Sequence, residues 1–572
     1  MLRQLKQLSM PASSLMRICI TLLLLFFTVN LQISWAAQPT PHETEELNRR
    51  ARQEAEDRKQ RETEKDIFLQ EKIEETVDES LLPTEELAFE IHTIRIEGER
   101  IKAFPWIQSM LDRYAGQRIG QEGLNIIVRN VTKALVGRGY ITTRVVVPEQ
   151  DLSSGTLLLT LVPGTISDIR FERADYEGTW KTAFPVRPGD LLNLRDIEQG
   201  LEQMKRVPSQ DVDIQLLPGK QPGESDILII AKETNPYKVT LSMDDSGSKA
   251  TGRLQTSATF SADNLLGLND LFHISFNKDA ERESNIHGTR GDSLYYSLPY
   301  GYWTYSLSKS SYDYHQTIPG LNTNYISSGI SDNTEFKIQR LIHRDQTSKT
   351  SLGARIIKKH SKSFIDDTEI EVQCKETTAA ELSLTHRRYI GKTVWDMELA
   401  NRRGVSWFGA QSEPDNLPAE SPTTRYQLWT FDTTLTRPVK LGKTPGTYTF
   451  NLRGQLTHDY LYGSDYFAIG NRYTVRGFDG EQTLSAERGW LIRNELGLAI
   501  GNNQELYTGI DYGRVSGPST KWLLGTHLTG ATIGLRGSIN RLYYDVFVGC
   551  PINKPEGYKT ASPTYGFQLI YQ

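Results

Sequence analysis

Cysteine, long apolar runs and blocks of like charge are all scarce in this chain of 572 residues. Of three cysteines, Cys19 lies in the N-terminal apolar segment, so neither a disulfide scaffold nor a cysteine-based metal cluster is expected. The other two, Cys374 and Cys550, are open to pairing in an oxidising compartment, although their spacing does not demand it. Beyond residue 36 no apolar run reaches about 18 residues, which excludes an inner-membrane protein built from spanning helices. The net charge of -5, without any Lys and Arg run, argues against nucleic acid as a partner.

Catalytic signatures are absent as well. Two Gly-Lys-Thr triplets, at 391–393 and 442–444, resemble the end of a Walker loop, but the first glycine of the GxxxxGK[ST] pattern is replaced by His386 and Arg437. No HExxH, GxSxG or Cys-x-x-Cys pattern occurs, and the ten histidines are scattered. We therefore expect neither an enzyme nor a bound cofactor or metal.

Residues 1–36 are typical of a secretory signal peptide. Positive charge comes before a short apolar core, Ile18 to Val29, and Ser34-Trp35-Ala36 offers small residues for cleavage before Ala37. The alternative, a single transmembrane anchor, is disfavoured because the apolar core is short and lacks a stop-transfer flank. The mature chain is expected to be exported.

Residues 37–65 form a highly charged segment. Roughly two-thirds of the residues from His42 to Lys65 are charged, and only Leu47, Ala51 and Ala55 make a thin apolar stripe. Oppositely charged pairs three or four apart support a helix, but such a helix cannot drive burial against an apolar core. It is either a solvated helix or disordered arm, or a helix in a polar, water-filled lumen. A linker follows over residues 66–88.

Two similar units of about 70 to 75 residues come next, at 89–163 and 164–234, and both have the order β-α-β-β. The first has strands at Phe89–Ile96, Tyr140–Pro148 and Gly155–Pro163, with a helix around Leu124 to Leu135. The second has strands at Ile166–Phe171, Asp211–Leu217 and Asp226–Ala231, with a helix at Leu194–Met204. The order and size resemble POTRA domains, the periplasmic receptor modules of outer-membrane translocators. Small α+β units are common, so this resemblance of fold is modest by itself.

Residues 235–572 have the pattern of a transmembrane β-barrel. Val239, Leu241 and Met243 alternate with polar residues, and similar alternation recurs from strand to strand to the end of the chain, which contains 45 glycines and 26 tyrosines. About 335 residues at roughly 20 per strand and loop predict about 16 antiparallel strands, with one side facing lipid and the other a polar lumen. A large secreted β-sandwich or β-solenoid is the disfavoured alternative.

The motif Val475-Arg476-Gly477-Phe478 lies in a loop around residues 471–488 that precedes the last five predicted strands, so it joins strands 11 and 12. In the next strand but one, Ile510 and Tyr512 share the apolar face, so Asp511 points into the lumen. A loop folded inward would bring Arg476 within reach of this carboxylate, and Gly509 and Gly513 would leave room for it. The alternative is an ordinary solvated loop arginine.

Together these features resemble the TpsB family of two-partner secretion transporters. The resemblance also covers the stretches at 263–270 and 297–303, and it extends over nearly the whole mature chain. It implies that Arg476 and Asp511 form a latch, that the segment at 37–65 plugs the pore, and that the POTRA-like units receive a cognate secreted TpsA-type protein. One departure is the chain end, where Gln572 follows the aromatic residue usual in outer-membrane strands.

The resemblance further implies a monomeric pore in the outer membrane of a Gram-negative bacterium, surrounded by lipid, with its N-terminal domains in the periplasm and no nucleotide hydrolysis. The exported partner would be a haemolysin, an adhesin or a contact-dependent inhibition toxin. The alternative within the same superfamily is an outer-membrane protein assembly insertase, which usually carries more POTRA units and lacks the charged helix. A TonB-dependent transporter would need a folded N-terminal plug domain, for which the helical segment is too short.

Overall fold

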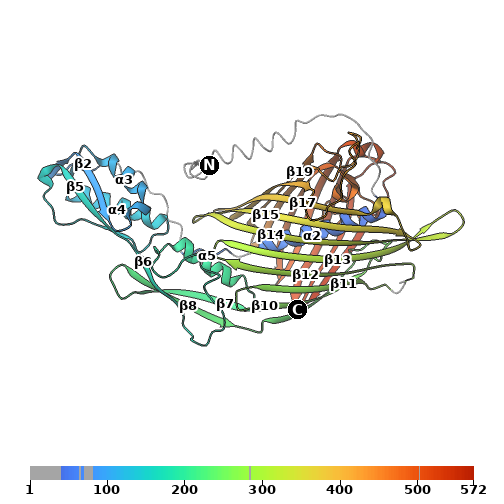
Figure 1. Cartoon of the computed structure of the whole chain (residues 1–572), viewed down its shortest axis with the longest axis horizontal. Helices are drawn as coiled ribbons and strands as arrows, with labels where there is room; N and C mark the ends of the chain where they lie inside the picture. Colours follow the sequence, from blue (N-terminus) through green and yellow to red (C-terminus); the bar gives the residue numbers. More distant parts are fainter. Residues whose placement is uncertain (1–39, 64–65, 70–81, 282–284, 502) are drawn as a thin grey trace.

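The computed structural model describes residues 40–63, 66–69, 82–281, 285–501 and 503–572. Two small α+β domains stand at one end of a large β-barrel, and a helix runs inside the barrel (Figure 1). The predicted signal peptide at 1–36 lies outside the described residues. No helix in the described ranges combines the length and the apolarity needed to cross a membrane.

The first domain has more elements than its predicted β-α-β-β order. Its elements are β1 Ala88–Ile91, β2 Thr93–Gly98, α3 Pro105–Leu111, β3 Gln117–Gly120, α4 Gln121–Gly137, β4 Arg144–Val146 and β5 Thr156–Val162. The predicted strand from Phe89 to Ile96 is two strands, because His92 N and Thr93 N both donate to Gly155 O and the chain changes sheet there. The short helix α3 was not predicted, although its Ile107 and Leu111 are fully buried in the domain core.

The predicted strand from Tyr140 to Pro148 was also too long. Only Arg144–Val146 is β4, because the residues before it complete the end of α4. Tyr140 N donates to Leu135 O at 2.9 Å, and the Tyr140 ring packs edge-on against Phe104. A backbone engaged at a helix terminus cannot pair in a sheet at the same time.

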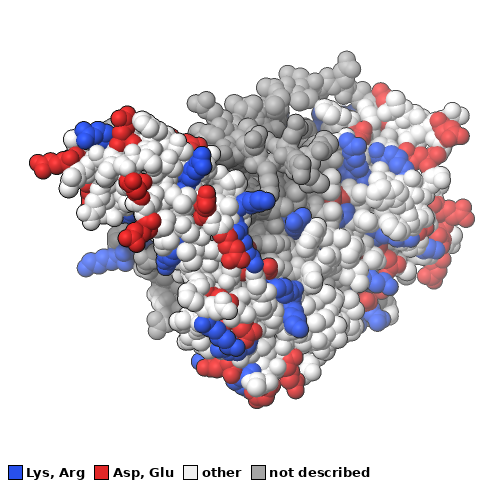
Figure 2. All heavy atoms as spheres, turned by 60° about the vertical axis from the view of Figure 1, so that its left-hand side comes forward, with Lys and Arg blue, Asp and Glu red and all other residues white. Residues whose placement is uncertain are grey.

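The second domain has the predicted order of elements. Its elements are β6 Thr165–Phe171, α5 Leu194–Lys205, β7 Gln210–Pro218 and β8 Glu224–Glu233, with the sheet order β6-β8-β7. Asn193 caps α5 by accepting from Arg195 N at 2.9 Å, and the apolar face of α5 lies on the sheet. Leu194 N donates to Gly139 O at 2.8 Å and joins the two domains. Figure 2 shows acidic and basic residues interspersed over the face that these domains bring forward.

The barrel closes from sixteen long antiparallel strands in the described part of the chain, as predicted. The strands are β9 Tyr237–Asp244, β10 Gln255–Asp263, β11 Leu271–Asp279, β12 His287–Tyr300, β13 Trp303–Pro319, β14 Asn324–Arg344, β15 Ser348–Ile365, β17 Lys375–Ile390, β18 Thr393–Val405, β19 Gln427–Leu441, β20 Thr444–Thr457, β23 Arg488–Gly501, β24 Gln504–Ser516, β25 His527–Ile539, β26 Leu542–Asn553 and β27 Thr564–Tyr571. The two-residue strand β16, Thr368–Glu369, pairs antiparallel with the end of β15. Apolar residues such as Leu241 and Ile510 are exposed on the outer wall, which is the side that was predicted to be apolar.

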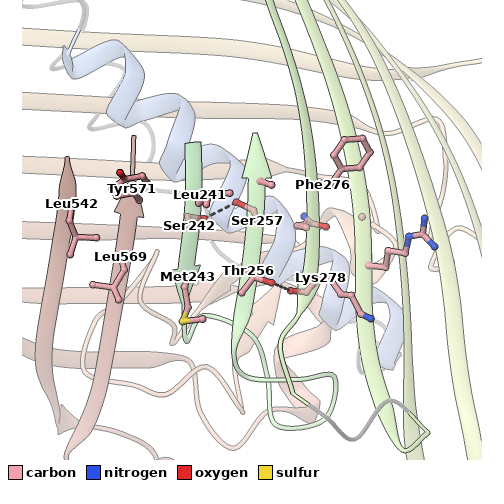
Figure 3. A pocket seen from close by; sticks show the side chains of 14 residues that line it. Leu241, Ser242, Met243, Thr256, Ser257, Phe276, Lys278, Leu542, Leu569 and Tyr571 are labelled. Atoms are coloured by element: carbon pink, nitrogen blue, oxygen red, sulfur yellow. Dashed lines mark hydrogen bonds between the residues drawn. The ribbon is translucent and has the colours of Figure 1, made fainter. Parts of the chain in front are cut away.

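Closure occurs between β27 and β9 through four register pairs, Gln568 to Tyr571 against Asp244 to Leu241. The outer wall carries a groove along this seam (Figure 3). Leu241, Met243 and Leu569 line it with apolar side chains. The seam is therefore the most briefly paired junction between long strands of the barrel.

Two turns of the barrel hold the second domain. The turn at 264–270 presents fully buried Asn269, whose Nδ2 donates to Thr179 O at 2.7 Å. In the β12–β13 turn, Gly301 N donates to Thr182 O at 2.7 Å. These turns belong to the two stretches, at 263–270 and 297–303, on which the family resemblance partly rested.

The Gly-Lys-Thr triplets lie at the β17–β18 and β19–β20 hairpins, where Gly391 and Gly442 have positive φ values of 60° and 62°.

Candidate functional site

The loop between β20 and β23 folds into the barrel and forms the centre of the site. It runs over residues 458–487 and contains β21 Phe467–Ile469 and β22 Leu484–Ala486, which pair with each other. The predicted bounds of 471–488 were too narrow, because they omitted β21 and the turn η6, Gly463–Asp465, before it. As β20 and β23 are the eleventh and twelfth long strands, the loop belongs to the end opposite the α+β domains.

The structure places Arg476 directly on Asp511 of β24. Arg476 Nε donates to Asp511 Oδ2 at 2.7 Å, and Nη2 donates to Oδ1 at 2.8 Å, which makes a bidentate pair. The Arg476 backbone N–H adds a third bond to Asp511 Oδ2 at 3.0 Å. Both residues are buried, with 6% and 1% of their surface exposed. The loop tip is thus bound to the wall by charge and by backbone together.

A second carboxylate, Glu495 of β23, was missed by the sequence reasoning. It accepts from Arg476 Nη1 and forms an ion pair of 2.8 Å with Arg536, which also pairs with Glu505 at 2.6 Å. Glu495 is the register partner of Gly509, so strand pairing would have identified it if the register had been known. The arginine of the loop therefore bridges two adjacent strands.

Glycines make the room that the loop tip occupies. A Cβ at Gly509 would lie 2.4 Å from Arg476 Nη2, and one at Gly513 would lie 2.7 Å from Val475 Cγ2. Gly530 of β25 was not predicted, yet a Cβ there would meet Arg476 O at 1.9 Å. Gly477 itself has φ of 101°, a conformation that a side chain would strain. Strand parity places Gly530 on the lumen side, whereas its contact with the loop depends on the register of β24 with β25.

The lumen beneath the loop is apolar, whereas a polar lumen was predicted. Val475 is fully buried and Phe478 is 4% exposed. They belong to a cluster that also contains Phe467, Ile469, Leu484, Ala486, Leu491, Val515, Leu528 and Tyr558. The Phe478 and Tyr558 rings meet edge-on at 5.7 Å between centroids. Because the loop supplies its own apolar residues, inward-facing Leu491 and Leu528 are shielded from water.

Arg472 makes a further contact between loop and wall that was not predicted. Its Nη2 lies 2.5 Å from Asp245 Oδ1 and donates to Asp245 O at 2.9 Å. Asp245 directly follows β9, so Arg472 ties the loop to the seam side of the barrel, whereas Arg476 ties it to β23 and β24. Arg472 and Arg476 thus attach the loop to different sides of the wall.

The charged segment forms α2, Pro41–Thr63, within the lumen (Figure 1). Its polar contacts reach several strands: Glu43 pairs with Lys375 at 2.8 Å, and Tyr312 donates to Glu45 at 2.7 Å. Arg50 Nη1 donates to Ser464 O of the inward loop at 3.0 Å. Contrary to expectation, Leu47 also packs in a small apolar cluster with Tyr426, Leu428, Leu461 and Tyr466. The helix is therefore attached by ion pairs, hydrogen bonds and a small apolar cluster.

No group of three or more possible metal ligands occurs among the described residues. Cys374 and Cys550 are both free thiols. Arginine, carboxylates, glycines and a lumen helix thus make up the site. Such an arrangement can hold or release a loop and a helix.

Comparison with known proteins agrees with this architecture. Residues 223–537 match the family of haemolysin secretion/activation proteins ShlB/FhaC/HecB, residues 89–164 match a POTRA domain of the ShlB type, and residues 165–218 match a POTRA domain. The chain is 43% identical to the outer membrane transporter CdiB-2 of Burkholderia pseudomallei, over 82% of this chain and 81% of that protein.

Two further similarities cover most of the chain. It is 30% identical to the hemolysin transporter protein ShlB of Serratia marcescens, over 71% of this chain and 72% of that protein. The structure of CdiB from Acinetobacter baumannii superposes with a TM-score of 0.83 at 28% identity, over 94% of this chain and all of that one. The chain therefore belongs to the ShlB/FhaC/HecB family and is an outer-membrane transporter of the two-partner secretion type.

Proposed function

We propose that this transporter exports one large cognate TpsA-type protein through its lumen. The higher identity with CdiB-2, 43% against 30% for ShlB, favours a partner of the contact-dependent inhibition type over a haemolysin. The helix in the lumen and the two POTRA domains favour secretion over the assembly insertase that the sequence left open. The proposed pore is monomeric, lies in outer-membrane lipid and uses no nucleotide.

In this proposal the POTRA domains bind the unfolded partner by strand addition. Among the described strands, β7 pairs with β8 alone, so its other edge offers backbone N–H and C=O groups to an extended chain. Folding of the partner outside the cell would then draw the chain through the pore.

The proposal assigns gating to α2 and latching to Arg476. The observation that carries it is the double occupation of the lumen, by α2 and by a loop fixed through Arg476 and Asp511. A polypeptide cannot pass while α2 stays, so α2 leaves during transport. The attachments of α2 are mostly ion pairs and hydrogen bonds, such as that of Glu43 with Lys375, and water can solvate these groups once the helix leaves the lumen. The loop, held by buried groups, stays behind to shape the path.

Secretion and conductance test this assignment separately. Deleting the transporter should trap one large partner in the periplasm, and normal secretion of every such partner would refute the export role. Deleting residues 41–63 should raise the conductance of the purified pore in a planar bilayer. An unchanged conductance would show that α2 does not close the lumen.

A further inference from the structure

The four residues Asp66 to Leu69, which we call the clip, lie just beyond the C-terminal end of α2 and are attached to the barrel rim. The Asp66 carboxylate, with 1% of its side chain exposed, lies 2.5 Å from Lys349 Nζ at the start of β15. Arg387 of β17 approaches it at 3.5 Å, and the Tyr389 hydroxyl donates to it. Asp66 is therefore bound by two strands of the wall, at the end that faces the POTRA domains.

The same four residues are attached to the second POTRA domain. Leu69 N donates to Glu198 Oε1 of α5 at 2.8 Å, and Glu198 is fully buried. Arg195 fixes the other oxygen of this carboxylate at 2.7 Å. Ile67 packs against the apolar core of the domain. The clip thus contacts two bodies, the barrel and the POTRA domain, within four residues.

Arg344, the last residue of β14, binds the clip and α5 at once. Its Nη2 donates to Ile67 O at 2.6 Å, and its Nη1 donates to Glu202 Oε2 at 2.8 Å. Its guanidinium lies 5.9 Å from the centre of the Phe68 ring, which meets the Tyr389 ring edge-on at 5.1 Å. Only 2% of the Arg344 side chain is exposed. Water therefore has little access to these bonds.

Lys349 repeats this arrangement, because it pairs with Asp66 and also with Glu202. Arg344 and Lys349 are thus shared between the clip and α5. A displacement of α5 from the rim would remove Glu202 from both cations and carry Glu198 away with its bond to Leu69. When the barrel and the second POTRA domain separate, the clip cannot keep its contacts with both the rim and α5.

We propose that Asp66 and Phe68 are positioning residues. They couple the contact between the second POTRA domain and the barrel rim to the position of α2 inside the lumen. This inference rests on the proposed function of α2 as the gate. While α5 sits on the rim, the clip fixes the end of α2 that faces the periplasm. Movement of α5, for instance when a partner chain binds the domain, breaks the clip and frees α2.

A distance measurement on the full-length transporter in lipid nanodiscs tests the coupling. Spin labels are placed on cysteines that replace Gln53 of α2 and Lys392 of the β17–β18 turn, with Cys374 and Cys550 changed to serine. We expect Asp66→Asn to raise the ratio of displaced to resident α2 about tenfold or more, because a buried charge-assisted pair is lost. Asp66→Glu should restore the resident population. Glu172→Gln, which removes an exposed carboxylate of the second POTRA domain, is the matched control.

Two results would overturn the coupling. In the first, Asp66→Asn leaves the ratio of displaced to resident α2 unchanged, although deletion of residues 41–63 opens the pore. In that case α2 would close the pore without any control by the clip. The second comes from cysteines at Gln203 and Thr304, whose side chains now lie 3.4 Å apart between α5 and the rim. A crosslink there should hold α2 in the lumen and block secretion until it is reduced, and undiminished secretion by the crosslinked protein would contradict the coupling. If deletion of residues 41–63 does not open the pore, the proposed role of α2 as the gate is refuted.

Discussion

Replacing Arg476 by alanine should release the inward loop. The substitution removes the bidentate pair with Asp511 and the bonds to Glu495 and Asn494 O. Asp511 would stay buried, with Arg493 Nε at 3.8 Å as its nearest remaining cation. The loss of Arg476 would destabilise Glu495 less, because Arg536 still forms an ion pair of 2.8 Å with this carboxylate.

The size of the effect follows from burial. Removing one partner of a buried ion pair costs about 3 to 5 kcal/mol. Since about 1.4 kcal/mol changes an equilibrium tenfold, the ratio of released to latched loop should rise roughly a hundredfold to a few thousandfold. The backbone bond from Arg476 N to Asp511 is not removed directly, which favours the lower end of this range.

Hydrogen exchange at residues 467–487, measured by mass spectrometry in nanodiscs, reports the opening of the loop. Exchange should accelerate in Arg476→Ala and Asp511→Asn alike, and the double variant should be little worse than either single one. Secretion of the partner should follow the same order. Arg514→Ala removes an exposed arginine from the outer face of the same strand and serves as control. Fully additive effects of the two substitutions, or unchanged exchange in both, would refute the latch.

Three other perturbations have definite expected outcomes. Phe478→Ala should cost about 3 to 5 kcal/mol of loop stability because the ring is buried, and exchange of the loop unchanged from wild type would contradict this packing role. Gly530→Ala should also expel the loop tip, since the new Cβ would meet Arg476 O at 1.9 Å. Gly501→Ala should secrete normally, because its Cβ would lie 3.6 Å from Gln504 Oε1, an ordinary van der Waals contact. Burial, assisted by nearby Asp190, raises the pKa of Asp196 to about 7, so the second POTRA domain should lose stability as the pH rises from about 4 to about 7. Asp196→Asn should remove that dependence in thermal unfolding, and a persisting dependence would assign it to another group.

The alternation along the strands was readable because its period is local. Side chains on a strand point to opposite faces at every second residue, so the outward position of Ile510 fixes the inward position of Asp511 without knowledge of the fold. The number of barrel strands followed from the length of this pattern. A pattern of this kind can be recognised in a single sequence because it depends only on neighbouring residues.

Partners that lie on other strands could not be read in this way. Glu495, Gly530 and Asp245 reach the loop only after barrel closure and strand register have placed β23, β25 and the end of β9 around it. The clip shows the same limit, since Asp66 and Lys349 are separated by 283 positions in the chain. A charged side chain has many suitable partners in a sequence of this composition. The sequence therefore determined which residues face the lumen, and the tertiary structure alone decided which of them meet, because the contacts depend on strand register and domain docking over long separations.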